Sequence, residues 1–91
     1  GIKVSGEFNQ VTNATNAKIN TTGSSGRGIS IKGDSSVAIN NGSISTLGSS
    51  SYGIYIGKDN NSATNSGTIE TVQSYGIYLD GNFNQFTNTE I

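Results

Sequence analysis

The sequence contains no cysteine and no histidine. Without cysteine the chain can build neither a disulfide framework nor a thiolate metal site. Without histidine it lacks the commonest general base and the commonest metal ligand in proteins. No stretch approaches the roughly 18 consecutive apolar residues that a membrane-spanning helix needs. We therefore expect no disulfide-stabilised scaffold, no bound cofactor and no membrane span in these residues.

Charge is also scarce. Only 12% of the residues are charged, and the net charge at pH 7 is −1. An average soluble domain has about twice this share of charged residues. The five basic residues are scattered along the chain and form no basic run. A nucleic-acid partner is therefore not expected, because such partners are recognised by clustered basic residues.

Small polar residues dominate what remains. Glycine, serine, asparagine and threonine number 13, 14, 12 and 10, which together make 49 of the 91 residues. The apolar share is only 31%, a value that often accompanies disorder. Disordered chains are normally rich in charge as well, and this chain is nearly neutral. The composition therefore favours a folded chain whose core uses few apolar residues.

An internal repeat predicts the fold. Four segments open with the same pattern: Gly1-Ile2-Lys3-Val4, Gly28-Ile29-Ser30-Ile31, Gly53-Ile54-Tyr55-Ile56 and Gly76-Ile77-Tyr78-Leu79. The openings are 27, 25 and 23 residues apart, and such a period is typical of solenoids. Each repeat has three short β-type runs, separated by glycine, serine, asparagine or aspartate. We predict an all-β chain that forms a parallel β-helix of about four coils, with three short strands per coil.

The coil boundaries follow from the openings. They are residues 1–27, 28–52 and 53–75, with a partial coil at 76–91. The second run of each repeat is centred on Val11, Ala38, Ala63 and Phe86, and the third on Ile19, Ile44 and Ile69. In stacked coils, equivalent residues lie above one another at about 4.8 Å. We expect one inward column of Ile2, Ile29, Ile54 and Ile77, and a second of Val4, Ile31, Ile56 and Leu79.

An asparagine stands twelve residues after every opening glycine. These residues are Asn13, Asn40, Asn65 and Asn88. A side-chain amide turned inward at a corner can both donate and accept hydrogen bonds. Stacked at strand spacing, the four amides would form a ladder that satisfies the polar groups of the turn. A solvated turn asparagine is the alternative, and the constant offset favours the ladder.

The tyrosines form two pairs. Tyr55 and Tyr78 lie on the outward side of the first run, where adjacent coils should stack them. Tyr52 and Tyr75 precede the opening glycine, and their parity places them inward or at a corner. Arg27 occupies the equivalent place one coil earlier and favours the corner. An exposed aromatic strip suits a glycan or a protein partner, but cross-strand stabilisation of the sheet is the favoured interpretation.

The acidic residues also fall into one column. Glu7, Asp34, Asp59 and Asn82 each stand six residues after an opening glycine. A carboxylate column could hold Ca²⁺ or, as in pectin-degrading β-helices, supply the carboxyl pair of a glycosidase. Ordinary turn formation explains the same residues, so we expect no metal and no catalysis. Recurring threonines near the third run raise an ice-binding surface as a further alternative, but the array that such a surface needs is interrupted.

The pattern from Gly53 to Thr71, Gly-Ile-Tyr-Ile followed by Asn and then Gly-Thr-Ile-Glu-Thr, resembles the passenger repeats of bacterial autotransporter adhesins and haemagglutinin-like exoproteins. The resemblance covers all four coils. It implies a right-handed parallel β-helix that is secreted or displayed on a bacterial outer surface. It also implies a structural or adhesive, non-catalytic role, with host glycans or surface proteins as possible partners.

A longer period lies above the coil repeat. Residues 7–13 resemble residues 82–88, which lie 75 residues further on and therefore three coils away. Neither end of the sequence has the polar cap that a solenoid needs. We therefore expect either a segment of a longer array, contacting neighbouring coils of the same protein, or a subunit that stacks end to end into an extracellular fibre. The segment is the favoured alternative.

Overall fold

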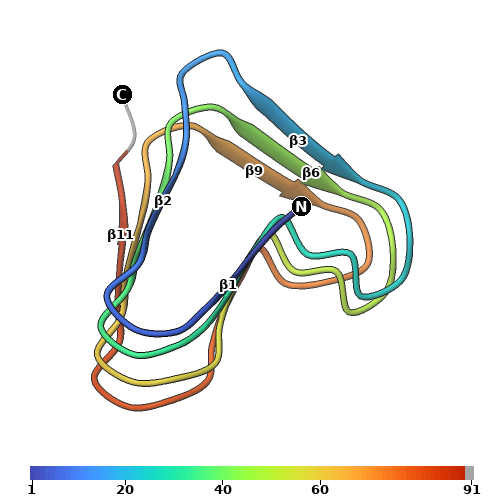
Figure 1. The fold of residues 1–91 in the computed structure, drawn as a ribbon. Helices are drawn as coiled ribbons and strands as arrows, with labels where there is room; N and C mark the ends of the chain where they lie inside the picture. Colours follow the sequence, from blue (N-terminus) through green and yellow to red (C-terminus); the bar gives the residue numbers. More distant parts are fainter. Residues whose placement is uncertain (90–91) are drawn as a thin grey trace.

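A computed structural model describes residues 1–89, which contain eleven short strands and no helix (Figure 1). Turn residues separate strands of three or four residues, so the chain changes direction after every strand. The strands are β1 (Ile2–Ser5), β2 (Gln10–Asn13), β3 (Lys18–Thr21), β4 (Ile29–Lys32), β5 (Val37–Asn40), β6 (Ser43–Thr46), β7 (Ile54–Ile56), β8 (Ser62–Asn65), β9 (Thr68–Thr71), β10 (Ile77–Leu79) and β11 (Gln85–Asn88). None of these residues lies in a helix long and apolar enough to cross a membrane.

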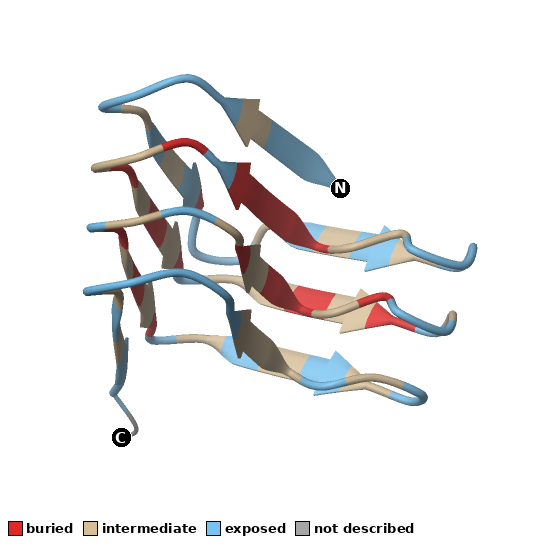
Figure 2. Cartoon of the chain, turned by 90° about the horizontal axis from the view of Figure 1, so that it is seen from below, coloured by how far each residue is buried: buried red, intermediate tan, exposed pale blue. Residues whose placement is uncertain are grey.

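The strands form three parallel sheets, one on each side of a triangular coil. The first sheet has the order β1-β4-β7-β10, the second β2-β5-β8-β11 and the third β3-β6-β9. Viewed along the stack, the chain turns clockwise as it recedes from the N-terminal face (Figures 1 and 2). The solenoid is therefore right-handed, the hand that parallel crossovers almost always take.

The coil count differs slightly from the sequence-based prediction. The third sheet has three strands where the other two have four, so the chain makes three complete coils and the first two sides of another. The coil starts agree with the prediction, because Ile2, Ile29, Ile54 and Ile77 pair in register in the first sheet. The predicted parallel β-helix is confirmed.

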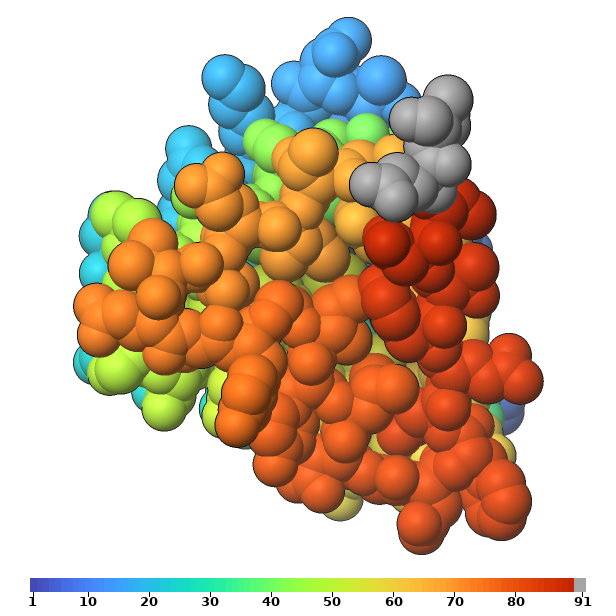
Figure 3. Space-filling model, turned by 180° about the vertical axis from the view of Figure 1, so that it is seen from behind, coloured from blue at the N-terminus to red at the C-terminus, as the bar shows by residue number. Residues whose placement is uncertain are grey.

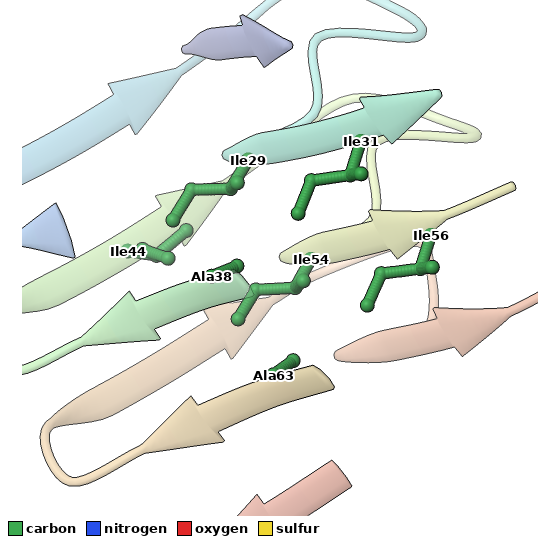
Figure 4. Close-up of a cluster of buried hydrophobic side chains, with 7 residues drawn as sticks. All are labelled: Ile29, Ile31, Ala38, Ile44, Ile54, Ile56 and Ala63. Atoms are coloured by element: carbon green, nitrogen blue, oxygen red, sulfur yellow. The ribbon is translucent and has the colours of Figure 1, made fainter. Parts of the chain in front are cut away.

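A narrow aliphatic core fills the two central coils. Its fully buried members are Ile29, Ile31, Ala38, Ile44, Ile54, Ile56 and Ala63 (Figure 4). Burying one isoleucine side chain contributes about 1.5–3 kcal/mol, so a few stacked columns suffice for so small a cross-section. The outer coils are less covered, as Figure 2 shows, and Ile2 and Leu79 remain 36% and 39% exposed.

The corner between the first and second sheets repeats one backbone conformation. The residue seven positions after each opening glycine has a positive φ of 55–60°. These residues are Phe8, Ser35, Asn60 and Phe83. Left-handed backbone is unfavourable for such residues, and in the first three coils the N–H of this residue donates to a carbonyl of the next coil. Phe8 N–H, for example, donates to the Asp34 carbonyl one coil below.

The connection from the third sheet back to the first shapes the outer surface. After β3, β6 and β9 the chain runs outward, reverses and returns to the start of the next first-sheet strand (Figure 1). The returning segments stack on one another and form a projecting lobe, visible from the C-terminal face in Figure 3. Ser25 and Ser50, at equivalent places in this reversal, have positive φ values of 56° and 53°. The lobe positions the residues described next.

Candidate binding surface

Four tyrosines meet on the outer side of the first sheet. Tyr55 in β7 and Tyr78 in β10 pair in register, with ring centroids 5.7 Å apart. Tyr52 lies on the returning segment, and its ring is 4.8 Å from that of Tyr78 and 5.8 Å from that of Tyr55. Tyr75, one coil further, lies 6.0 Å from both Tyr52 and Tyr78. We call Tyr52, Tyr55, Tyr75 and Tyr78 the tyrosine cluster.

The cluster resolves a question that the sequence left open. Tyr52 and Tyr75 are not in the core, because Tyr52 is half-buried and Tyr75 is 66% exposed. Both side chains point outward from the corner at the start of the first sheet, and the returning segment places their rings against those of Tyr55 and Tyr78. Offset-stacked aromatic pairs contribute about 0.5–1.5 kcal/mol beyond their buried area. The two pairs seen in the sequence are thus one surface.

Arg27 closes the N-terminal side of the tyrosine cluster. Its guanidinium carbon lies 4.1 Å from the ring centroid of Tyr55 and 5.3 Å from that of Tyr52. A guanidinium within about 6 Å of an aromatic face is held by a cation–π interaction. Arg27 therefore occupies the column of Tyr52 and Tyr75 and continues the surface toward the first coil.

A shallow groove lies on the far side of Arg27. Its volume is about 480 Å³, and Lys3, Ser30 and Lys32 line it together with Arg27. We call it the basic groove, because none of its lining residues is acidic. Ser30 is only 6% exposed, and its hydroxyl has no hydrogen-bond partner among the described residues. The buried Nε of Arg27 also lacks a partner there.

The four asparagines stack at the corner between the second and third sheets. The Nδ2 of Asn13 donates to Asn40 Oδ1 at 2.8 Å, and Asn40 Nδ2 donates to Asn65 Oδ1 at the same distance. The step from Asn65 to Asn88 is 2.9 Å. Asn40 is fully buried, and its Nδ2 also donates to the carbonyls of Gly42 and Thr68. These bonds satisfy buried turn carbonyls, and the role of the column is structural.

A second polar column lies at the corner between the first and second sheets, and sequence reasoning missed it. Its members stand eight residues after each opening glycine: Asn9, Ser36, Asn61 and Asn84. Ser36 Oγ accepts the Asn9 backbone N–H, and Asn61 Oδ1 accepts that of Ser36 at 2.6 Å. The constant offset of eight residues could have predicted this column, but the second coil has a serine where the others have asparagine, so the residue type is not constant.

The acidic column also bonds to the backbone of the next coil. Asp34 Oδ1 accepts the N–H of Asp59 at 3.1 Å, and Asp59 Oδ1 accepts that of Asn82 at 2.8 Å. Within residues 1–89 no three acidic side chains gather closely enough to hold a metal ion. In this column the carboxylates of Asp34 and Asp59 serve as hydrogen-bond acceptors at the turn.

The recurring threonines near the third strand are not an open array. Thr46 is buried, and its hydroxyl donates to the Ser51 carbonyl. Thr21 and Thr71 are half-buried and donate in the same way, to the carbonyls of Gly26 and Ser74. These side chains fasten the returning segment to the third sheet. They offer no exposed threonine lattice of the kind an ice-binding surface needs.

Comparison of this chain with protein families, curated proteins and solved structures finds no match. The fold and the candidate surface therefore rest on the residues described above.

Proposed function

We propose that these residues form a structural and adhesive β-solenoid of a secreted or surface-exposed bacterial protein, without catalytic activity. The solenoid serves as a stiff scaffold, and the tyrosine cluster is the surface that contacts a partner. The resemblance to adhesin passenger repeats supports this role and the extracellular location.

The observation that carries the proposal is the position of Tyr75. Its ring completes the tyrosine cluster but is 66% exposed, so most of its apolar surface is not used for stability. Tyrosines offer large contact areas, a polar tip and little loss of side-chain entropy on binding. Four of them on one side of a chain with only seven aromatic residues form a concentrated contact surface.

Scaffold stiffness is supported by the hydrogen bonds between coils. Polar columns join successive coils at the corners, and Asn40 is bonded both to Asn13 above it and to Asn65 below it. Bending the stack would break such bonds in a buried, low-dielectric setting, where they are strong and their loss is unfavourable. A rod of this kind presents its surface side chains at fixed spacing.

Binding of the purified chain to glycan arrays and to surfaces coated with extracellular proteins tests the proposal. Tyr75→Ala should weaken binding at least about tenfold, the effect of losing roughly 1.4 kcal/mol of contact energy. Phe83→Ala is the control, because Phe83 is an aromatic residue at a different corner and is even more exposed, at 85%. Absence of binding to every surface, or equal loss in both variants, would refute the adhesive role.

A self-assembling fibre is the second candidate, and the direction of the asparagine ladder favours it. Every amide donates toward the C-terminal coil. A uniform direction makes the two ends of the ladder complementary, so head-to-tail stacking of two copies would continue it from Asn88 to Asn13 and extend the sheets. Electron microscopy and mass measurement test this: filaments at rising concentration support it, and discrete monomers exclude it.

A further inference from the structure

The basic groove and the tyrosine cluster form one continuous surface. Arg27 belongs to both, since it lines the groove and lies 4.1 Å from the ring of Tyr55. In the first sheet, Lys3, Ser30, Tyr55 and Tyr78 are consecutive partners in register. Three strand spacings separate the first from the last, about 14 Å. Positive charge therefore lies at one end of this line and stacked rings at the other.

Two unpaired polar groups lie where the basic groove adjoins the tyrosine cluster. Ser30 is only 6% exposed, and its hydroxyl has no hydrogen-bond partner among the described residues. The neighbouring Arg27 Nε is equally unpaired. Buried polar groups are almost always hydrogen-bonded, and leaving one unpaired is unfavourable. Both atoms are closed to solvent beneath the lining of the groove, so a ligand there reaches them only when the side chains that cover them move aside.

We propose that this continuous surface binds an acidic polysaccharide, with sulfate or carboxylate groups in the basic groove and sugar rings against the tyrosine cluster. The two Nη groups of a guanidinium donate parallel hydrogen bonds that match the oxygens of a carboxylate or sulfate. Lys3 and Lys32, both exposed, flank that position with positive charge. The apolar C–H faces of sugar rings fit the exposed ring of Tyr75. This inference rests on the adhesive role proposed above and names its ligand.

Charge distribution favours a glycan over a nucleic acid. Single-stranded nucleic acids also combine aromatic stacking with basic grooves. Domains that bind them are normally strongly basic, whereas this chain has a net charge of −1 and an isoelectric point near 5.0. The three cations of the groove, Lys3, Arg27 and Lys32, suit a polymer that has fewer charges per unit length than a nucleic acid.

Calorimetry on the purified chain tests the inference with dextran sulfate and polygalacturonate as probes and uncharged dextran as the reference. The two anionic probes separate sulfate from carboxylate recognition. The double variant Lys3→Ala/Lys32→Ala should bind the preferred probe about tenfold more weakly, because two exposed charge contacts are lost and solvent screens both of them. The matched control is Lys18→Ala/Lys58→Ala, which removes the same charge from exposed positions that do not line the groove.

Ser30→Ala separates a ligand contact from a packing defect. If the hydroxyl meets the ligand, the variant binds several-fold more weakly while its melting temperature is unchanged or higher. If the hydroxyl is only a defect, stability rises and binding is unchanged, and this assignment of Ser30 is wrong.

Three outcomes would overturn the acidic-glycan inference. They are equal weakening by both lysine pairs, tighter binding of oligothymidine than of either anionic glycan, and no binding of the anionic glycans. In the last case, binding to neutral glycans or proteins that is still lost in Tyr75→Ala would leave the adhesive proposal standing. Absence of binding to all of these surfaces would remove both.

Discussion

The side-chain nitrogen of Asn40 donates to the side-chain oxygen of Asn65 at 2.8 Å, in a corner closed to solvent. The same side chain accepts from Asn13 in the preceding coil. One residue thus joins three coils through a single amide. A polar column of this kind lets a chain with so few apolar residues close its turns without unsatisfied backbone groups.

Removing that amide should be strongly destabilising. Asn40→Ala leaves Asn65 Oδ1 and two turn carbonyls without their donor, and each such loss costs about 1–3 kcal/mol. We expect the free energy of unfolding in urea, followed by circular dichroism, to fall by about 2–4 kcal/mol. Asn20→Ala, at an exposed position of β3, should change it by less than about 0.5 kcal/mol. Similar values for the two variants would mean that the ladder contributes little.

The opening glycines differ in what surrounds them. A Cβ added at Gly53 would collide with the Ile69 side chain and lie 2.6 Å from the Gly76 carbonyl oxygen, whereas at Gly76 its nearest neighbour is 3.8 Å away. Neither glycine has a positive φ, so only packing distinguishes them. Gly53→Ala should destabilise the chain by about 1–3 kcal/mol, and Gly76→Ala should be neutral or slightly stabilising. Thermal unfolding of both variants checks this, and equal melting temperatures would contradict it.

The tyrosines should separate into stabilising and exposed members. The ring of Tyr55 packs against Arg27, Tyr52 and Tyr78, so Tyr55→Ala should lower the free energy of unfolding by about 2 kcal/mol. Tyr75 is far more exposed, and Tyr75→Ala should lower it by less than about 1 kcal/mol. Denaturant titration measures both. A larger loss for Tyr75 would assign its ring to stability and weaken the binding role.

The acidic corner should depend on hydrogen bonding more than on charge. Asp59→Asn keeps an oxygen that can accept the Asn82 N–H, and asparagine already occupies this column at position 82. We expect Asp59→Asn to be near neutral and Asp59→Ala to lose about 1–2 kcal/mol of stability. Asp80→Ala removes the same charge at an exposed site and controls for electrostatics. Equal losses in the asparagine and alanine variants would show that the charge itself matters.

Much of the architecture followed from spacing. The opening glycines and the isoleucines after them predicted the coil starts and the register of the first sheet, because each inward residue must lie over its equivalent. The asparagine offset likewise pointed to the column that joins Asn13, Asn40, Asn65 and Asn88. The second polar column, at the corner between the first and second sheets, was missed because one of its four members is a serine. The Ser36 hydroxyl accepts the backbone N–H that an asparagine oxygen accepts in the other coils.

The sequence by itself determined the repeat, the inward columns and the outward direction of Tyr55 and Tyr78, since these depend on a period that local alternation fixes. Only the tertiary structure decided that Tyr52, Tyr75 and Arg27 would meet those rings. Their position depends on how the segment after each third-sheet strand reverses and returns, and its glycines and serines carry no hydrophobic period. The stacking of one returning segment on the next, through hydrogen bonds between coils, sets that path and creates the candidate surface.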